Sequence, residues 1–524
     1  MKTTVDLLVL GAGIAGCTAA LRAADLGASV VLVTKDDLGG TNTSWAQGGI
    51  IGLAPSEAGD SPDLLAADIH AAGAGLCRDE AVRLLAEEGP KLCRSFLWER
   101  LGVPFDLGQG GQPEAIAEAA HSAKRIYHAK DATGLAIQTA LNEAVREHPN
   151  IQVRERLCLV DLITSPHHCL NPVRVYESIR VHGAFLFDPA TGQVEALRAR
   201  RTLLATGGLG YLFLHTTNPP SATGDGLAAA YRASARIVNC EYIQFHPTAL
   251  YVPGKPRTLL TEALRGGGAR LVNRKGERFM TRYAPEQLEL APRDVVSRAI
   301  FQEMAASGEA CVYLDLAPVA AQVDLETHFP TVLSACRAEG LEPTRQPIPV
   351  VPAAHYFCGG VLVDLEGRTS LAGLFAAGEV ACTGLHGANR LASTSLLEGL
   401  VWGTRGAETA VAELRAGEDE DLGDLAEWRT PSAAQAPDPL LIDQDWSLIR
   451  TTLWNYAGIV RTGDRLHRAG ADLHYLAHRI NRFYHESPLS RELLELRSGI
   501  RCAQLILNAA RQNPESRGCH YRVD

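Results

Sequence analysis

The sequence predicts an α/β protein in three parts: a parallel-sheet domain with an interrupted chain, an α+β domain inserted into it, and a C-terminal helical bundle. Three observations support this prediction. A strand, a glycine turn, a helix and a second strand occupy the first 33 residues, and glycine-ended apolar strands recur at 201–206 and 373–377. After residue 445, apolar residues recur at helical spacing. A chain of 524 residues has room for about three such domains.

The first unit begins with the apolar strand Val5–Leu10 and continues through a helix over 14–26 to a β-branched strand over 29–33. The turn between the first strand and the helix reads Gly11, Ala12, Gly13, Ile14, Ala15, Gly16. A G-x-G-x-x-G turn in this context is typical of a Rossmann-like dinucleotide-binding domain, where the pyrophosphate rests on the helix N-terminus. We therefore expect these six residues to bind a dinucleotide.

The positions of the later strands indicate where the other domains begin and end. Between these strands, the chain becomes rich in proline, arginine and aromatic residues, which indicates an insertion. An acidic and then Pro/Ala-rich stretch is typical of a linker, and the helical segment follows it. The predicted boundaries are 1–235 and 357–416 for the discontinuous dinucleotide-binding domain, 236–356 for the inserted domain, 417–439 for the linker and 440–524 for the helical domain.

Composition excludes several classes of protein. Lys+Arg 50 against Asp+Glu 60 gives a net charge of −10, the wrong sign for a protein that coats nucleic acid or anionic membrane. No apolar run reaches the roughly 18 residues that span a bilayer, and the N-terminus lacks an export signal, so we expect a cytoplasmic protein with no membrane or nucleic-acid partner. The 12 cysteines include no C-x-x-C pair, so neither zinc nor an iron–sulfur cluster is expected.

The sequence indicates the identity of the dinucleotide less directly. An acid usually holds the ribose at the end of the second strand, but Lys35 stands there, which leaves NADP open. Two features favour FAD: a polar loop that could wrap a large ring system, and the distant pairs Gly378-Glu379 and Ser395-Leu396. The loop residues are Asn42, Thr43, Ser44, Trp45, Ala46, Gln47, Gly48 and Gly49.

The segment Ser393–Glu398 has the pattern of a capping box that opens a helix. The N-terminus of that helix could also face the flavin and stabilise its anionic reduced form.

Five strings in fixed order carry a family resemblance: FHPTAL at 245–250, TEALRG at 261–266, APRDVV at 291–296, PAAHY at 352–356 and LHGANRL at 385–391. With WNYAGIVRT at 454–462, the chain resembles the succinate dehydrogenase, fumarate reductase and L-aspartate oxidase flavoproteins from Val5 to about Arg468, and the oxidases most closely. The resemblance implies an FAD domain, a capping domain and a helical domain. It also implies FAD-binding roles for Lys35, Asp225 and Glu379, which removes the case for NADP.

The same resemblance implies the reaction: L-aspartate is oxidised to iminoaspartate, with O2 (giving H2O2) or fumarate as electron acceptor. This is the first step of NAD biosynthesis through quinolinate, with quinolinate synthase as a functional partner. A carboxylate of the substrate needs charge-assisted donors, which Arg390, His246, His355 and Thr261 could supply. By resemblance, Arg293 takes the substrate proton and passes it through Glu262 and Arg265; alternatively, Arg293 only clamps a carboxylate.

Two residues separate the subfamilies. Glu118 offers a carboxylate to the substrate ammonium that succinate lacks, although Ala119-Ala120 departs from the usual Gly-Gly of the motif. Asn42 stands where membrane succinate dehydrogenases carry a flavin-bonded histidine, so FAD should be non-covalent. The alternatives are a fumarate reductase or succinate dehydrogenase flavoprotein subunit and, in another class, a flavin-containing RNA-binding scaffold.

Two other patterns are interpreted as non-functional. His167-His168-Cys169 resembles a metal site but lies in an expected Pro-bounded loop without ligand spacing. Asn42-Thr43-Ser44 fits a glycosylation sequon, but no secretion signal accompanies it. We therefore predict no metal site and no glycan.

Overall fold

The computed structural model describes residues 4–52, 59–108, 110–118, 120–417, 423–426, 428–429 and 438–524. Most of the predicted linker (418–422, 427 and 430–437) lies outside these described residues, as does Ala119 beside Glu118.

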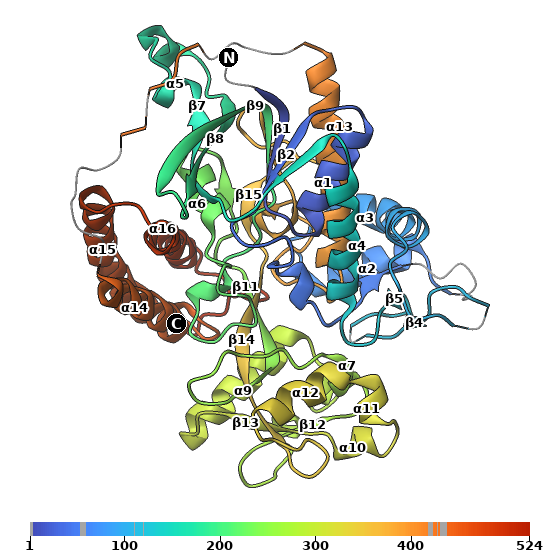
Figure 1. The fold of residues 1–524 in the computed structure, drawn as a ribbon. Helices are drawn as coiled ribbons and strands as arrows, with labels where there is room; N and C mark the ends of the chain where they lie inside the picture. The colour runs from blue at the N-terminus through green and yellow to red at the C-terminus, as the bar shows by residue number, and fades with distance from the viewer. Residues whose placement is uncertain are drawn as a thin grey trace.

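A seven-stranded sheet forms the centre of the upper part of the molecule in Figure 1. Its order is β6-β2-β1-β9-β8-β7, with β16 paired to β9. The strands are β1 Val5–Leu10, β2 Val30–Val33, β6 Ile151–Arg154, β7 Cys158–Thr164, β8 Val181–Asp188, β9 Gln193–Leu204 and β16 Leu374–Ala376. Because β16 pairs in parallel with β9, segments from both sides of the insertion complete one sheet. The predicted strand 201–206 is the end of the longer β9 and stops at Leu204, and Ala205 lies in the wall of the cavity described below.

Helices cover this sheet because the apolar runs of β1 and β2 need apolar cover on both faces. Helices α1 and α13 lie side by side against it (Figure 1). Glycine allows their close approach, since a Cβ at Gly403 would lie 2.6 Å from the Ala15 carbonyl oxygen. The helices of this part are α1 Ile14–Asp25, α2 Pro62–Ala72, α3 Asp79–Leu92, α4 Thr133–Glu147, α5 Ser165–His168, α6 Asp225–Arg232 and α13 Ser395–Arg415. The histidines expected in a loop at 167–168 thus end the short helix α5.

Two small sheets flank the large one. One joins β3 Ile50–Ile51, β5 Ile126–Tyr127 and β4 Ala115–Ile116, and supports the loop that carries Glu118. The other joins β10 Ile237–Val238, β15 Gly360–Leu362 and β17 Ala381–Cys382, close to where the chain enters and leaves the inserted segment.

The inserted segment forms the lower lobe of Figure 1, drawn in yellow and yellow-green. Its sheet has the order β11-β14-β13-β12 and is antiparallel. The strands are β11 Ile243–Leu250, β12 Arg270–Val272, β13 Val312–Asp315 and β14 Ile348–Phe357. The helices are α7 Ala263–Gly266, α8 Met280–Tyr283, α9 Arg293–Ser307, α10 Ala317–Ala320, α11 Leu325–His328 and α12 Pro330–Ala338. This lobe has its own apolar core, which includes Leu271, Ile300 and Leu333.

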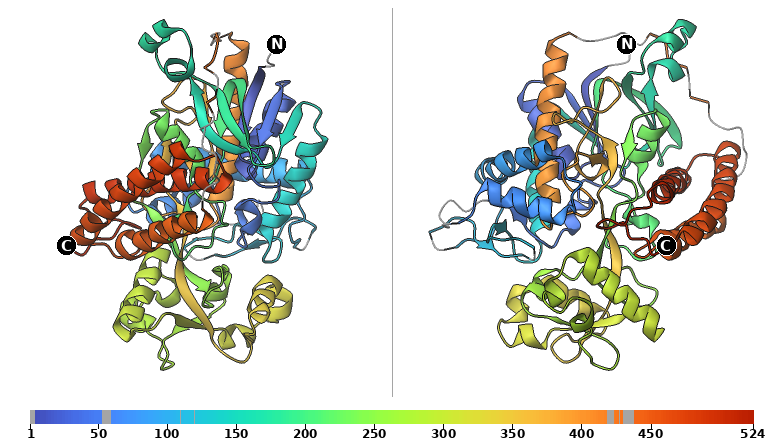
Figure 2. Two further views of the ribbon diagram at one scale, coloured as in Figure 1. Left: turned by 60° about the vertical axis from the view of Figure 1, so that its left-hand side comes forward. Right: turned by 180° about the vertical axis from the view of Figure 1, so that it is seen from behind.

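Three long helices end the chain and pack against one side of the large sheet domain, as the red segments in Figure 2 show. They are α14 Pro439–Ala457, α15 Gly463–Glu486 and α16 Arg491–Gln512. Each begins at a side-chain N-cap, since Asp438, Thr462 and Ser490 accept hydrogen bonds from backbone N–H groups of their helices. The predicted α/β class, with an α+β lobe and a helical end, is confirmed. Among the described helices, none is long and apolar enough to cross a membrane.

Candidate functional site

One long cavity runs from the glycine turn after β1 to the junction with the inserted lobe. Nearly all the predicted cofactor residues line it: Gly11, Ala12, Gly13, Ile14, Ala15, Lys35, Asn42, Thr43, Trp45, Ala46, Gln47, Gly48, Gly49, Asp225, Glu379, Ser395 and Leu396. At its other end lie Glu118, His246, Thr261, Glu262, Arg293, His355 and Arg390. The structure therefore brings the two predicted sets into one continuous space.

The glycine turn forms a narrow backbone cradle. Gly11 has φ +110°, and a Cβ there would lie 2.1 Å from the Ala205 carbonyl oxygen, so only glycine fits. The N-terminus of α1 opens into the cavity beside Gly13. This geometry suits a pyrophosphate, which needs close backbone approach and a helix N-terminus.

Three predicted site residues lie behind the cavity wall. A Cβ at Gly16 would lie 1.9 Å from the Gly11 carbonyl oxygen, so Gly16 serves the packing of the turn. The Ser44 hydroxyl donates to the Gly39 carbonyl at 2.7 Å and closes its own loop. Arg265 is fully buried and reaches the cavity only through Glu262.

Glu379 and the start of α13 line the middle of the cavity. The Glu379 carboxyl accepts from Asn42 Nδ2 at 3.2 Å and from the Phe357 N–H at 2.9 Å, while burial raises its pKa to about 7. The predicted capping box is wrong: the Thr394 hydroxyl donates to the Leu391 carbonyl, and Glu398 accepts from Thr383, Tyr356 and His386. The first turn of α13, with Ser395 and Leu396, faces the cavity instead.

Lys35 lies two residues after the end of β2, at the corner where a ribose is expected. Its ammonium nitrogen lies 2.6 Å from Asp225, 2.8 Å from the Thr223 hydroxyl and 2.9 Å from Glu495. Burial would lower the pKa of Lys35, but the two carboxylates outweigh it and raise that pKa. The charge of Lys35 is thus already neutralised, which leaves this corner unsuited to the extra phosphate of NADP.

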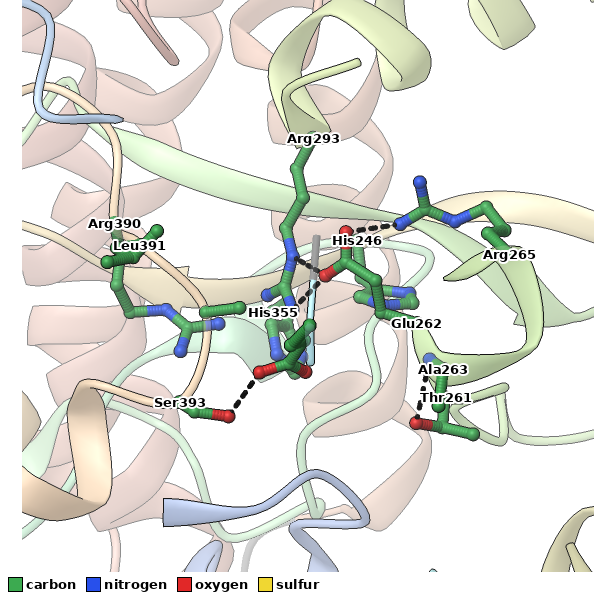
Figure 3. Close-up of polar contacts among 12 residues, drawn as sticks. His246, Thr261, Glu262, Ala263, Arg265, Arg293, His355, Arg390, Leu391 and Ser393 are labelled. Atoms are coloured by element: carbon green, nitrogen blue, oxygen red, sulfur yellow. Dashed lines mark hydrogen bonds and ion pairs between the residues drawn. The ribbon is translucent and has the colours of Figure 1, made fainter. Parts of the chain in front are cut away.

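A chain of buried charges links the cavity to the inserted lobe (Figure 3). Arg293, the first residue of α9, donates from Nε to Glu262 Oε2 at 2.6 Å, and Arg265 Nη2 donates to Glu262 Oε1 at 2.9 Å. Burial would raise the pKa of Glu262, but Arg293 and Arg265 lower it to about 2. The three predicted relay residues therefore form one connected chain with an ionised carboxylate at its centre.

Gln244 bridges the two arginines of the cavity, and sequence reasoning missed it. Its amide oxygen accepts from Arg293 Nη1 and from Arg390 Nε, both at 3.2 Å. Its amide nitrogen donates to the Arg390 carbonyl at 2.7 Å. Gln244 precedes His246 by two in β11 and so shares its face of the strand, which is the signal that could have revealed it.

Arg390 is held from three sides. Besides Gln244, its Nη1 donates to the Ser395 hydroxyl at 3.1 Å, and its guanidinium carbon lies 4.9 Å from the Tyr356 ring centre. Burial and the neighbouring Arg293 lower the pKa of Arg390 to about 10. The buried guanidinium groups of Arg293 and Arg390 thus lie beside one another and repel each other. An anionic ligand at this end of the cavity would relieve that repulsion.

His246 on β11 and His355 on β14 face each other, with ring centres 5.2 Å apart. Burial and the nearby arginines hold the pKa of both rings well below its ordinary value, so both are neutral near pH 7. The Thr248 N–H donates to His246 Nδ1 at 3.3 Å, which leaves Nε2–H as a donor. The Thr217 hydroxyl lies 2.8 Å from His355 Nδ1.

Glu118 brings a carboxylate into this cationic end. Its Oε2 accepts from the Ser393 hydroxyl at 2.5 Å, the bond that is drawn as the dashed line at Ser393 in Figure 3. Ser393, which the sequence suggested only as part of a capping box, has φ +59°, a conformation that favours glycine, in the turn between Arg390 and α13. Thr261 lines the same end, and its hydroxyl accepts from the Ala263 N–H at 3.4 Å. The end therefore offers two guanidiniums and two neutral imidazoles to carboxylates, and one carboxylate to a cation.

The chain matches two families. Residues 6–396 match the family described as FAD binding domain, and residues 447–524 match the one described as fumarate reductase flavoprotein C-term. It is 43% identical over 99% of its length to L-aspartate oxidase 1 of Ralstonia nicotianae, covering 95% of that protein. It is 42% identical over 99% of its length to the chloroplastic L-aspartate oxidase of Arabidopsis thaliana, covering 81% of that protein.

Solved structures agree in fold. An E. coli quinol fumarate reductase structure superposes with a TM-score of 0.87 at 28% identity, covering 100% of this chain and 92% of that one. A Mycobacterium smegmatis Sdh1 structure superposes with a TM-score of 0.83 at 29% identity, covering 99% of this chain and 89% of that one.

Proposed function

This chain belongs to the L-aspartate oxidase family of FAD-dependent oxidoreductases, and on that premise we propose that it oxidises L-aspartate to iminoaspartate. The predicted cofactor, FAD, is confirmed by the family match. The observation that carries the proposal is the pairing of the Glu118 carboxylate with the cationic cluster of Arg293, Arg390, His246 and His355 in one cavity. Aspartate presents two carboxylates and one ammonium, so its charges complement this set.

The two carboxylates of the substrate bind to the donors at this end. Arg390 is kept in place by Gln244, Ser395 and the Tyr356 ring, so its fork can grip one carboxylate in a bidentate manner. His246 Nε2–H, His355 and the Thr261 hydroxyl are the remaining donors. The buried position of the cluster excludes water and strengthens each of these contacts.

The substrate ammonium pairs with Glu118. The Ser393 hydroxyl fixes one carboxylate oxygen of Glu118, and the other lies 3.5 Å from where a Gly48 Cβ would be. A charge-assisted hydrogen bond of this kind contributes roughly 1–3 kcal/mol. Succinate has no ammonium and gains nothing from this contact, so Glu118 supplies selectivity.

Arg293 passes one N–H proton of its guanidinium to Glu262 and, as the neutral guanidine, accepts the proton that leaves the substrate carbon next to the one that bears the amine. Its guanidinium donates to Glu262 Oε2, and Glu262 Oε1 accepts from Arg265 Nη2, so a proton has a continuous hydrogen-bonded path into the inserted lobe. Arg265 Nη1 continues to the Glu289 carbonyl at 2.6 Å. We assign Arg293 as the proton-transfer residue and Glu262 and Arg265 as its relay.

FAD bound in this cavity would supply the hydride acceptor of the reaction, with O2 (giving H2O2) or fumarate as the final electron acceptor. Asn42 lies beside Glu379 in the cavity and has no nucleophilic ring nitrogen, so we propose that the cofactor is held without a covalent bond. Gly11–Ala15, Lys35 with Asp225, and Ser395-Leu396 hold it along its length. We place the reaction as the first step of NAD biosynthesis, with quinolinate synthase consuming the iminoaspartate.

Fumarate reduction is the second candidate activity. It is favoured by the cationic end, which fits any C4 dicarboxylate, and by the superposition on a quinol fumarate reductase. Glu118 argues against it as the main activity, because an unpaired carboxylate beside succinate or fumarate is unfavourable.

Anaerobic flavin spectra test the proposal. Purified holoenzyme is mixed without oxygen with L-aspartate, D-aspartate or succinate, and the loss of flavin absorbance is followed. We expect rapid bleaching with L-aspartate alone, followed by recovery on adding O2 or fumarate. Bleaching with succinate and none with L-aspartate would overturn the assignment in favour of the second candidate.

A further inference from the structure

The C-terminal helix α16 reaches the ribose corner of the cofactor cavity. Glu495 lies on its second turn and pairs with Lys35 Nζ at 2.9 Å. An ammonium group has three N–H donors, and the three neighbours of Lys35 Nζ are Asp225, Thr223 and Glu495. Lys35 thus has no donor left for a ribose hydroxyl while these contacts last.

Helix α16 also fastens the backbone on both sides of this corner. Arg491 donates to the Lys35 carbonyl at 3.2 Å and pairs with Asp36 at 2.8 Å. About three turns along the helix from Arg491, the Cys502 thiol donates to the Gly224 carbonyl at 3.3 Å, directly before α6. A Cβ at Gly224 would lie 2.6 Å from Cys502 Sγ, so the two segments are in close contact.

These contacts explain why the corner can carry lysine where a dinucleotide fold usually carries an acid. Asp225 starts α6, lines the cavity and is paired with Lys35, so its carboxylate would be the acceptor for the ribose hydroxyls of a bound dinucleotide. We propose that Glu495 is a positioning residue for FAD: by holding Lys35 from the C-terminal domain, it fixes Asp225 toward the ribose. This rests on the FAD site of the proposed function but not on the substrate.

The same cluster accounts for the choice of nucleotide. Within the described residues it comprises two cations, Lys35 and Arg491, and three carboxylates, Asp36, Asp225 and Glu495, so 2 − 3 = −1. An additional 2′-phosphate would meet net negative charge and is repelled. The C-terminal domain is therefore part of the cofactor's recognition site.

The test compares Glu495→Gln with Glu492→Gln, an exposed glutamate one turn earlier on the same helix. Binding of FAD and of ADP to apoprotein is measured by flavin fluorescence quenching and by calorimetry, with FMN as the ligand that lacks the adenosine end. We expect Glu495→Gln to weaken FAD and ADP about tenfold and to leave FMN unchanged, whereas Glu492→Gln changes none of them.

Two further measurements separate positioning from a general loss of fold. In a Lys35→Met background, Glu495→Gln should have no added effect on FAD affinity, because its effect passes through Lys35. Reciprocally, FAD should increase hydrogen-exchange protection of the first turns of α16, since coupling between two sites acts in both directions.

Three outcomes would each overturn the proposal. The first is that Glu495→Gln and Glu492→Gln have the same FAD affinity, and the second is that Glu495→Gln weakens FMN and FAD equally. The third is that the effects of Glu495→Gln and Lys35→Met on FAD affinity are additive. None of these outcomes bears on L-aspartate oxidation, which is measured with substrate and saturating FAD.

Discussion

The two ends of the cavity are built in opposite ways. At the cofactor end, consecutive residues of one turn approach the ligand with their backbone, and the decisive feature is the missing Cβ at Gly11. At the substrate end, charged side chains come from β11, α9, β14 and the turn before α13, and the decisive feature is their mutual pairing. Cofactor binding therefore depends on steric fit at the first end, and substrate oxidation depends on charge at the second. Substitutions at the two ends should impair different properties of the protein.

The largest expected effect is at the charged end. Arg293→Met removes the residue that leads the proton path and leaves Glu262 with only Arg265. We expect kcat with L-aspartate to fall about 10³-fold or more, because proton-transfer residues typically supply 10²–10⁴-fold. FAD affinity should stay within about twofold, since the contacts of Gly11 and Lys35 are untouched. The measurement is anaerobic flavin bleaching by stopped flow.

Arg298→Met provides the control for that change. Arg298 lies on the same helix, pairs with Asp294 and donates to the Gly518 carbonyl away from the cavity. It should keep near-normal turnover. If Arg293→Lys restores turnover while only KM rises, Arg293 acts as a carboxylate clamp and the relay assignment is wrong.

The next largest effect is at the backbone end. Gly11→Ala places a Cβ 2.1 Å from the Ala205 oxygen at φ +110°, so the turn must open. We expect FAD affinity to fall roughly a hundredfold, about 3 kcal/mol. Gly27→Ala is the matched control: Gly27 has φ +92°, but its Cβ would meet nothing within 4 Å. It should lose about 1 kcal/mol of stability and no FAD affinity; equal losses of FAD in both variants would contradict the steric account.

Selectivity is the third and smaller effect. Glu118→Gln keeps the shape of the side chain and its neighbour Ser393 but removes the negative charge. We expect kcat/KM for L-aspartate to fall roughly 10-fold or more while the affinity for succinate is unchanged or improved. Glu114→Gln, which changes an exposed glutamate on the other side of the short strand β4, should change neither. Equal losses for both ligands would mean that Glu118 does not contact the ammonium.

A local sequence pattern predicted the backbone end, whereas the charged end was predicted only through motif resemblance, and the reason is physical. The turn from Gly11 to Gly16 is contiguous, so its pattern reports its own geometry, whereas Gln244 becomes a bridge only when β11 meets α9 and the turn before α13. The residues of the charged end were predicted through motif resemblance, and the structure brings them together. The contact between Lys35 and Glu495 joins positions 460 apart in sequence, which no local pattern can indicate.

The wrong capping box teaches the same lesson. The segment Ser393–Glu398 has the pattern of a local cap, but Glu398 is buried and accepts from Tyr356, Thr383 and His386 instead. Because Tyr356 also supports Arg390 with its ring, a residue that looked like a helix signal belongs to the support of the substrate end. Tertiary contacts override a local preference whose stabilisation is only about 1 kcal/mol.

The smallest effect is a pH dependence confined to the charged end. In the free protein, burial and the nearby arginines hold the pKa of His246 and His355 well below its ordinary value, so both rings are neutral near pH 7. A bound dicarboxylate adds negative charge beside them and raises these pKa values, so binding takes up protons and succinate affinity should rise as pH falls from 8 to 6. One linked proton limits the change to about tenfold per pH unit. Calorimetry in buffers of different ionisation enthalpy measures the uptake directly.

FAD affinity provides the internal comparison and should not change between pH 8 and 6. The groups described at its ribose corner include no histidine: they are Lys35, Asp36, Thr223, Asp225, Arg491 and Glu495. Succinate binding with no proton uptake and no pH dependence from pH 8 to 6 would contradict the expected rise of the pKa of His246 and His355, and would mean that the arginines, and not the imidazoles, supply the charge at this end.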